Sequence, residues 1–182
     1  MNIKIEASFA ALPLIETINT ARFDRGVVGL WWLGQAGFAL RFGDTLILID
    51  PYLSDSLAEK YRNSELKHLR MMPPPVDPAA IRGCDWFLCT HGHTDHMDTQ
   101  TIAAVLHTNA PQFVIPRAEA ERGRQRFIPL ERAHLINAGE SLSLGAGMAV
   151  EAAAAAHEEL VQDEAGNHRF LGYILTLGSL RL

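Results

Sequence analysis

The chain has 182 residues, of which 48% are hydrophobic and 20% charged, and its formal net charge at pH 7 is −5. This length supports one sizeable core, so a single domain over residues 1–182 is expected, with the composition of a globular protein. The acidic balance and the lack of a basic stripe argue against nucleic acid as a partner, and no run reaches the roughly 18 apolar residues of a membrane-spanning helix.

The cysteine pattern indicates a reducing compartment. Cys84 and Cys89 lie five residues apart, which is not a Cys-x-x-Cys pair, and both fall in or beside an apolar run. Buried, inert thiols are therefore expected, with a ligand role for Cys89 as the weaker alternative. Few cysteines and no signal peptide predict a cytoplasmic protein.

The N-terminal part is predicted to hold one helix and three strands. Leu12, Ile15 and Ile18 recur at helical spacing, which predicts a short amphipathic helix within residues 11–22. Three strands are then expected, joined by tight turns, at residues 27–33, 38–42 and 45–49. Consecutive hairpins build a mostly antiparallel sheet, and Asp50 places a carboxylate at the mouth of the third strand.

The next segment, residues 54–75, is polar and then proline-rich. A helical turn is expected at 56–61, whereas three successive prolines at 73–75 exclude regular helix or central strand. A long irregular segment beside a strand-end carboxylate often forms an active-site wall, which makes His68 and Arg70 candidates for substrate contact. The alternative is an exposed loop with two ordinary charged residues.

Helices and strands alternate through the rest of the chain. Residues 85–89 form a short apolar run typical of a buried strand, and Asp98 or Thr99 can cap a helix that continues to about His107. A second helix is expected at 117–122, with Gly123 as its end. Further strands are expected at residues 113–115, 134–136, 141–144, 148–150 and 170–177.

Three arginines cluster at the end of the second of these helices and just after it. Arg122, Arg124 and Arg126 lie among Glu119, Glu121 and Glu131. This mixture of signs indicates a solvated helix face rather than a nucleic-acid-binding patch.

The loop after the buried strand carries a dense set of metal-ligand side chains. Residues 91–98 contain three imidazoles and two carboxylates, the groups that zinc or manganese takes as ligands. The pair His91 and His93 could serve one metal, and Asp95 and His96 a second metal about 3.5–4 Å away. The alternative is chance clustering in a polar loop, which is disfavoured because so many side chains could not all find separate hydrogen-bond partners there.

This pattern resembles a known signature. His-x-His-x-Asp-His after an apolar strand resembles the metallo-β-lactamase superfamily. Four further segments, in this order, resemble its branch of metal-dependent hydrolases that includes L-ascorbate-6-phosphate lactonase: residues 30–38, 45–54, 73–78 and 155–158. The resemblance runs from about Leu14 to the last residue and implies an α/β fold, an αββα sandwich of mostly antiparallel sheets.

The resemblance also implies roles for particular residues. His91, His93 and His157 would form the first metal site, and Asp95 and His96 would serve the second. Asp50 would lie beneath the centre and orient a ligand, with a simple strand cap before proline as the alternative. The alanines at 152–156 favour helix by propensity, but the resemblance implies a strand that leads to His157.

The implied reaction is hydrolysis with a divalent metal, manganese or zinc, up to two per complete site. A metal lowers the pKa of bound water from 15.7 to about 7, so hydroxide could attack the lactone or ester-like carbonyl of a small, anionic substrate. Asp95 could hold this nucleophile in line and accept a proton. The alternatives are a metal-dependent phosphodiesterase and a non-catalytic metal-binding module.

The chain departs from the superfamily pattern at its end. The superfamily completes its site with a bridging Asp and a late His, and no residue after His168 matches that His. An incomplete second sheet, one metal bound more tightly than the other, and weak activity of this chain alone are therefore expected. An open sheet edge would favour a homo-oligomer.

Overall fold

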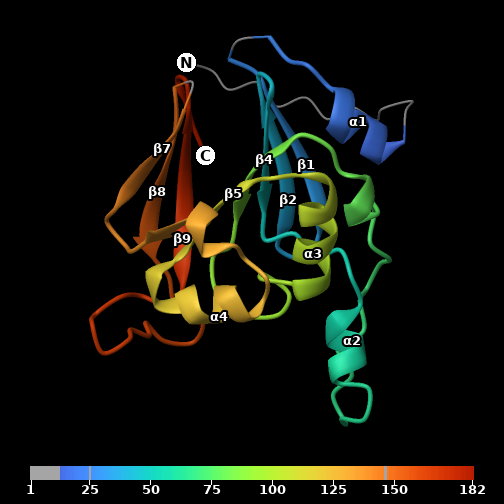
Figure 1. The fold of residues 1–182 in the computed structure, drawn as a ribbon, viewed down its shortest axis with the longest axis vertical. Helices are drawn as coiled ribbons and strands as arrows, with labels where there is room; N and C mark the ends of the chain where they lie inside the picture. Colours follow the sequence, from blue (N-terminus) through green and yellow to red (C-terminus); the bar gives the residue numbers. More distant parts are fainter. Residues whose placement is uncertain (1–12, 25, 146) are drawn as a thin grey trace.

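A computed structural model describes residues 13–24, 26–145 and 147–182, and within them two β-sheets pack face to face (Figure 1). The first sheet has the strand order β1-β2-β3-β4-β5-β6. Its strands are β1 (Val28–Gly34), β2 (Gly37–Phe42), β3 (Thr45–Ile49), β4 (Cys84–Leu88), β5 (Gln112–Pro116) and β6 (Ala133–Ile136).

The pairing within this sheet changes at β3. The strands β1, β2 and β3 pair antiparallel, as the predicted hairpins require, with Phe42 opposite Thr45 at the second turn. From β3 to β6 every pairing is parallel, because helical crossovers rather than hairpins connect these strands. The carboxyl ends of β3, β4 and β5 therefore meet at one edge.

The second sheet is antiparallel throughout, with the order β10-β9-β8-β7. Its strands are β7 (Ser141–Gly145), β8 (Met148–Ala154), β9 (Leu171–Leu177) and the short β10 (Leu180–Arg181), which the sequence pattern missed. The alanine-rich segment is strand up to Ala154, as predicted, because pairing with β9 along its whole length overrides helix propensity.

Seven helical segments lie in the described part of the chain, of which α1 precedes the first strand and the other six connect strands. The α-helices are α1 (Leu14–Thr20), α2 (Ser56–Lys60), α3 (Thr99–Thr108) and α4 (Ala120–Gln125), and the 3₁₀ turns are η1 (Pro78–Ala80), η2 (Arg117–Glu119) and η3 (Leu130–Arg132). The predicted end of the second helix at Gly123 is wrong. Gly123 lies inside α4, where a Cβ would approach Cδ1 of Ile115 to 2.8 Å, so the glycine serves close packing rather than termination.

Two hydrophobic cores separate the layers. One lies between the first sheet and the helices and contains Ile18 of α1 and Ile102 and Val105 of α3. The other fills the space between the sheets, where Leu88 and Val114 of the first sheet share a cluster with strands β8 and β9. The layer order seen in Figure 1 is thus helix, sheet, sheet, the first three layers of the predicted sandwich.

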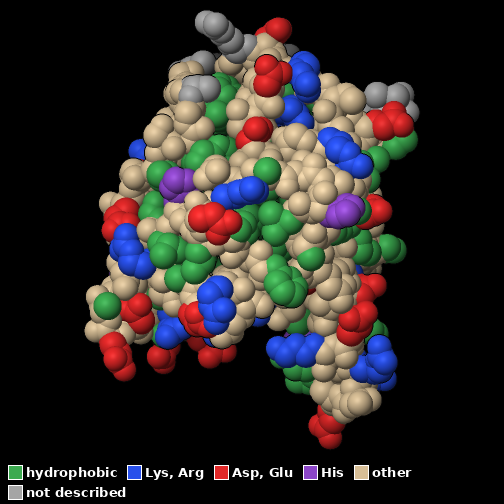
Figure 2. Space-filling view, in the orientation of Figure 1, with side chains coloured by type: hydrophobic (Ala, Val, Ile, Leu, Met, Phe, Trp, Pro, Cys, Tyr) green, Lys and Arg blue, Asp and Glu red, His purple; other side chains and the backbone are tan. Residues whose placement is uncertain are grey.

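Charged side chains of both signs lie on the face of the molecule that Figure 1 presents. Figure 2 shows this face, on which acidic and basic side chains are interspersed without a continuous basic band. Among the described residues, no helix is both long and apolar enough to cross a membrane.

Candidate metal centre

The candidate site lies at the carboxyl ends of the parallel strands. Asp50 follows β3 directly, and its N–H donates to the carbonyl of Leu88 in β4 at 2.9 Å. Thr90 and His91 follow β4 along the chain. Polar side chains from two neighbouring strands therefore converge here, which is where open parallel sheets commonly bind ligands.

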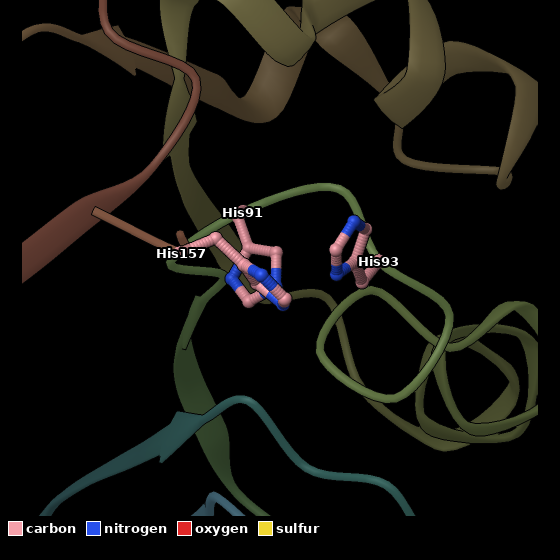
Figure 3. Close-up of side chains that lie close together, drawn as sticks. All are labelled: His91, His93 and His157. Carbon is pink, nitrogen blue, oxygen red and sulfur yellow. The ribbon is translucent and has the colours of Figure 1, made fainter. Parts of the chain in front are cut away.

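Three histidines come together at this edge. Their rings turn toward one another (Figure 3), and one nitrogen from each of His91, His93 and His157 lies within 4.8 Å of the other two. A single metal with Zn–N bonds of about 2.0–2.1 Å needs its ligand nitrogens roughly 3.4 Å apart, so small side-chain adjustments would close the set around one ion.

His91 shows why this cluster suits a cation. The residue is 7% exposed, and Nε2 is buried with no hydrogen-bond partner among the described residues, while Nδ1 lies 3.1 Å from Oγ1 of Thr90. A buried, unpaired nitrogen is costly unless something occupies its lone pair. The three histidines therefore fit a divalent metal, although their role as ligands stays a prediction.

His157 reaches the cluster from the second sheet. It lies just beyond β8, and the backbone before it is held where the N–H of Ala155 donates to the carbonyl of Phe170 at 3.1 Å. The Phe170 ring packs against the cluster, with centroid distances of 5.0 Å to His91 and 5.4 Å to His157. No local signal marked Phe170 as part of the site, because its contacts join residues that lie far apart in the chain.

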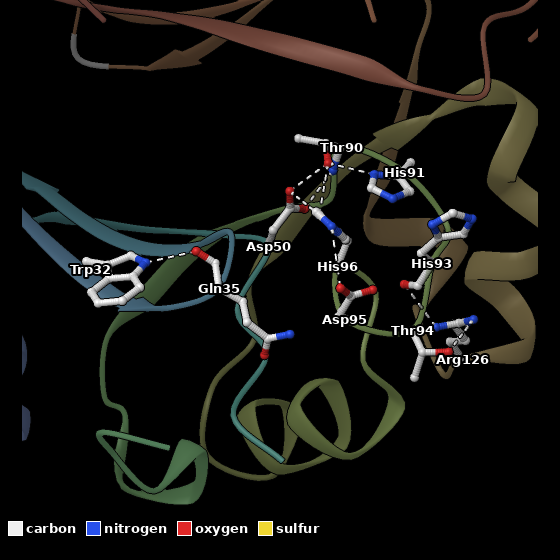
Figure 4. A network of polar contacts seen from close by, with 10 residues as sticks. All are labelled: Trp32, Gln35, Asp50, Thr90, His91, His93, Thr94, Asp95, His96 and Arg126. Atoms are coloured by element: carbon white, nitrogen blue, oxygen red, sulfur yellow. Dashed lines mark hydrogen bonds and ion pairs between the residues drawn. The ribbon is translucent and has the colours of Figure 1, made fainter. Parts of the chain in front are cut away.

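Asp50 organises the floor of the site (Figure 4). Its Oδ1 accepts the backbone N–H of Thr90 at 2.8 Å, and its Oδ2 accepts the Thr90 hydroxyl at 2.6 Å and lies 2.8 Å from Nδ1 of His96. Since a carboxylate only accepts, Nδ1 of His96 is the donor, and Nε2 is directed to the other side of the ring. Asp50 thus orients His96, and these contacts go beyond a simple strand cap. The role of Asp50 beneath a metal centre stays a prediction.

Asp95 and His96 lie beside the three histidines. The His96 ring centroid is 3.9 Å from that of His91, and Oδ2 of Asp95 is 3.9 Å from Nε2 of His96. The structure therefore brings all six predicted site residues to one place, and the pair Asp95–His96 adjoins the cluster without belonging to it.

The pKa values of the imidazoles differ within this group. Burial, followed by the neighbouring histidines, lowers the pKa of His91 to about 3, and burial and His157 also lower the pKa of His93. Burial acts in the same direction on His96, but the hydrogen bond and charge of Asp50 outweigh it and raise the pKa of His96. His91 and His93 are consequently neutral near pH 7, the form in which imidazole binds a metal.

A cavity of about 370 Å³ opens over the cluster. One wall comes from α2 and the turn after it, which project from the body of the molecule and are called the arm below (Figure 1). This wall consists of Leu57, Lys60, Tyr61 and His68. The other wall contains Gly92, His93, Thr94, Asp95, Arg122, Arg126 and His157. His68 therefore lines the cavity, stacked on Tyr61 with ring centroids 4.2 Å apart.

Arg70 does not line this cavity. Its guanidinium lies over the Tyr52 ring and donates to the carbonyl oxygens of Tyr52 and Met72 at 2.6 and 3.0 Å. Arg70 therefore fastens the proline-rich segment to the strand end.

Two of the three arginines also contact the loop that carries the histidines, although the side chain of Arg122 is 43% exposed, as the predicted solvated face requires. Nη1 of Arg122 donates to the carbonyl of Gly92 at 3.2 Å, and Nη1 of Arg126 donates to that of His93 at 3.3 Å. Arg124 alone pairs with an exposed carboxylate, that of Glu121. Arg122 and Arg126 are one helical turn apart, and this spacing was the available signal that both face residues 91–96, called the histidine loop below.

Both cysteines are buried in the helix-side core. Burial raises the pKa of each thiol, and neither sulfur belongs to the histidine cluster. The expectation of inert core thiols agrees with this placement.

Comparison with known proteins places the fold and the site in a family. The chain is 28% identical over 146 residues to a protein of Escherichia coli named "Probable L-ascorbate-6-phosphate lactonase UlaG", covering 70% of this chain and 41% of that protein. It is 28% identical over 127 residues to an uncharacterized Mycobacterium tuberculosis protein, Rv0906, covering 69% of this chain and 33% of that protein. The chain thus spans well under half the length of these relatives.

A solved structure is similar as well. The isothiocyanate hydrolase from Delia radicum gut bacteria superposes with a TM-score of 0.59 at 21% identity, covering 83% of this chain and 59% of that one. The model of the family described as "Beta-lactamase superfamily domain" matches residues 45–182. Because this match takes in most of the chain, including every predicted ligand, the chain belongs to the β-lactamase superfamily, and the resemblance found in its sequence is confirmed.

Proposed function

We propose that this chain carries the metal-binding part of a metal-dependent hydrolase that opens a lactone or ester-like carbonyl in a small, anionic substrate. The observation that supports this most directly is the convergence of three imidazoles: His93 and His157 line an open cavity, and His91 beside them has a buried nitrogen that is unpaired among the described residues. Membership of the β-lactamase superfamily and the similarity to UlaG support the reaction class.

The chain's own residues divide the work as follows. A divalent metal held by His91, His93 and His157 would acidify water and polarise the substrate carbonyl. Asp95 lines the cavity with its side chain 31% exposed, so its carboxylate is placed to hold the attacking water and accept its proton. Asp50 holds the His96 ring in one orientation from below.

The cavity walls favour an anionic substrate. Lys60, Arg122 and Arg126 contribute positive charge, against the single carboxylate of Asp95. The guanidinium groups of Arg122 and Arg126 are already engaged with backbone carbonyls, whereas Lys60 lies on the exposed arm, 5.0 Å from the Tyr61 ring. Lys60 and His68 are therefore the residues best placed to meet a phosphate or carboxylate group on the substrate.

Metal identity and number are part of the proposal. Imidazole and carboxylate ligands suit zinc or manganese, and up to two ions would occupy a complete site. The three histidines offer a fuller ligand set than Asp95 and His96, so we expect the first metal to bind more tightly than the second. Metal content of the purified chain, with stepwise titration, tests both points.

A substrate panel tests the reaction. The panel contains L-ascorbate 6-phosphate, an unphosphorylated lactone, an isothiocyanate and bis(p-nitrophenyl) phosphate, each with zinc and with manganese. We expect turnover of lactones with preference for the phosphorylated one, and Asp95→Asn should lower kcat by roughly 100-fold or more. Asp55→Asn, which changes a carboxylate outside this cavity, is the matched control.

The outcomes separate the competing functions. Turnover of the phosphodiester alone would favour a phosphodiesterase. Stoichiometric metal binding without turnover of any compound would favour a non-catalytic metal-binding module.

We also propose that the chain self-associates and does not bind nucleic acid. Three large apolar side chains on the edge strand β1 and the turn before it, those of Val27, Leu30 and Trp32, are about half exposed. Sedimentation velocity across a concentration series tests the oligomeric state.

A further inference from the structure

Glu119, at the end of η2, is a buried carboxylate just behind the histidine loop. Its side chain is 4% exposed and does not line the cavity. Burying a carboxylate is costly unless it is paired, so this residue needs a compensating role.

The two carboxylate oxygens of Glu119 engage two different segments. Oε1 accepts a hydrogen bond from Nη1 of Arg169 at 2.9 Å. Oε2 accepts no hydrogen bond from the described residues but forms an ion pair with Arg122, 3.0 Å from its Nε. Arg122 is on α4, between β5 and β6 of the first sheet, whereas Arg169 comes just before β9 of the second. One side chain thereby ties two layers of the fold together.

Through Arg122, Glu119 is connected to the loop that carries His91 and His93. Nη1 of Arg122 donates to the carbonyl of Gly92, the residue between these two histidines. A Cβ at Gly92 would collide with Oε2 of Glu119. The histidine loop therefore rests directly on this carboxylate.

Through Arg169, Glu119 is connected to the segment that packs on His157. Arg169 precedes Phe170, whose carbonyl accepts from Ala155 and whose ring packs on His91 and His157. The N–H of the next residue, Leu171, donates to the carbonyl of Thr90 at 3.0 Å. The segment that Arg169 anchors is thus the one that holds His157 against the loop.

We infer that Glu119 is a positioning residue of the metal centre: through Arg122 and Arg169 it fixes the His91–His93 loop and the His157 segment relative to each other. It touches neither metal nor substrate. The inference rests on the proposed function, since it requires the three histidines to bind a metal.

The test compares Glu119→Gln and Arg169→Gln with Glu121→Gln. Glu121 lies two residues further along, is exposed and pairs only with groups of its own helix, so its variant is the matched control. Zinc affinity is measured by chelator competition well below the melting temperature of each metal-free variant, and the Co²⁺ absorption spectrum reports ligand geometry. We expect zinc affinity to fall about 10–100-fold in Glu119→Gln and Arg169→Gln and to stay unchanged in Glu121→Gln.

Further outcomes distinguish failure of the positioning role from failure of the proposed function. The double variant Glu119→Gln/Arg169→Gln should lose less affinity than the product of the two single losses, because both changes break one connection. Folded Glu119→Gln and Arg169→Gln with unaltered zinc affinity and Co²⁺ spectrum, even at a lower melting temperature, would overturn the positioning role alone. Absence of zinc and Co²⁺ binding by the unsubstituted chain would overturn the proposed function together with it.

Discussion

His157 stands 61 residues after His96 in the chain, yet its ring centroid lies 4.8 Å from that of His93. Only the resemblance to a family marked it beforehand, since an isolated histidine near an alanine run has no local signature. In the structure it supplies the third nitrogen of the cluster.

Replacing His157 should weaken metal binding. We expect His157→Ala to weaken zinc binding by at least about 100-fold, since three protein ligands fall to two. His107→Ala is the control, because His107 is exposed on α3 and outside the cluster. Zinc competition titrations measure both, and equal losses in the two variants would argue against a role for His157 as a ligand.

Gly92 is constrained by its neighbours rather than by its backbone angles. A Cβ there would collide with the Glu119 carboxylate and approach Cδ of Arg122 to 2.5 Å. We expect Gly92→Ala to destabilise the protein by about 1–3 kcal/mol, the usual cost of overpacking. Gly172→Ala, where a Cβ meets nothing within 4 Å, should change the free energy of unfolding by much less. Urea denaturation of both variants measures the difference, and a neutral Gly92→Ala would contradict the tight contact.

At the scale of elements, the start of α3 joins the histidine loop to the arm. Asp98 caps the helix as predicted: its buried Oδ2 accepts the N–H of Thr101 at 3.0 Å, and Oδ1 accepts the Ser56 hydroxyl at the start of α2. The same side chain thus fixes both the end of the histidine loop and the base of the arm.

Removing the Asp98 cap should lower the free energy of unfolding more than removing an exposed helix cap does. We expect Asp98→Ala to lower the free energy of unfolding by about 2 kcal/mol or more, because a helix cap is lost and buried donors are left unpaired. Asp77→Ala removes the exposed cap of η1 and should cost less than about 1 kcal/mol. Thermal or chemical unfolding compares the two, and similar losses would show that burial of the Asp98 contacts matters little.

The parallel half of the first sheet illustrates the limit of local patterns. Strand positions were predicted well, because short apolar runs bounded by polar residues mark buried strands. The direction of β4 to β6 was not, since hairpin turns fix antiparallel pairing locally whereas a crossover helix leaves the partner open. Gly123 was misjudged for a related reason: a glycine that ends a helix and one that admits a neighbouring side chain look the same in sequence.

At the scale of the whole molecule, the cores keep both thiols out of reach. Cys84 and Cys89 are 5% and 0% exposed, and burial raises their pKa values. We expect neither to react with Ellman's reagent in the native protein and both to react after denaturation. Rapid reaction of either thiol in the native state would contradict the packing of the helix-side core.

The sequence by itself determined the superfamily, the order of elements and the ligand types, because His-x-His-x-Asp-His after an apolar strand places several metal-binding groups on one short loop. Only the tertiary structure decided which distant residues complete the centre. His157 and Phe170 reach it because the second sheet packs on the first, and Glu119, Arg122 and Arg169 join the two segments from behind. Such contacts depend on how two sheets approach each other, and no local periodicity in the chain encodes that distance.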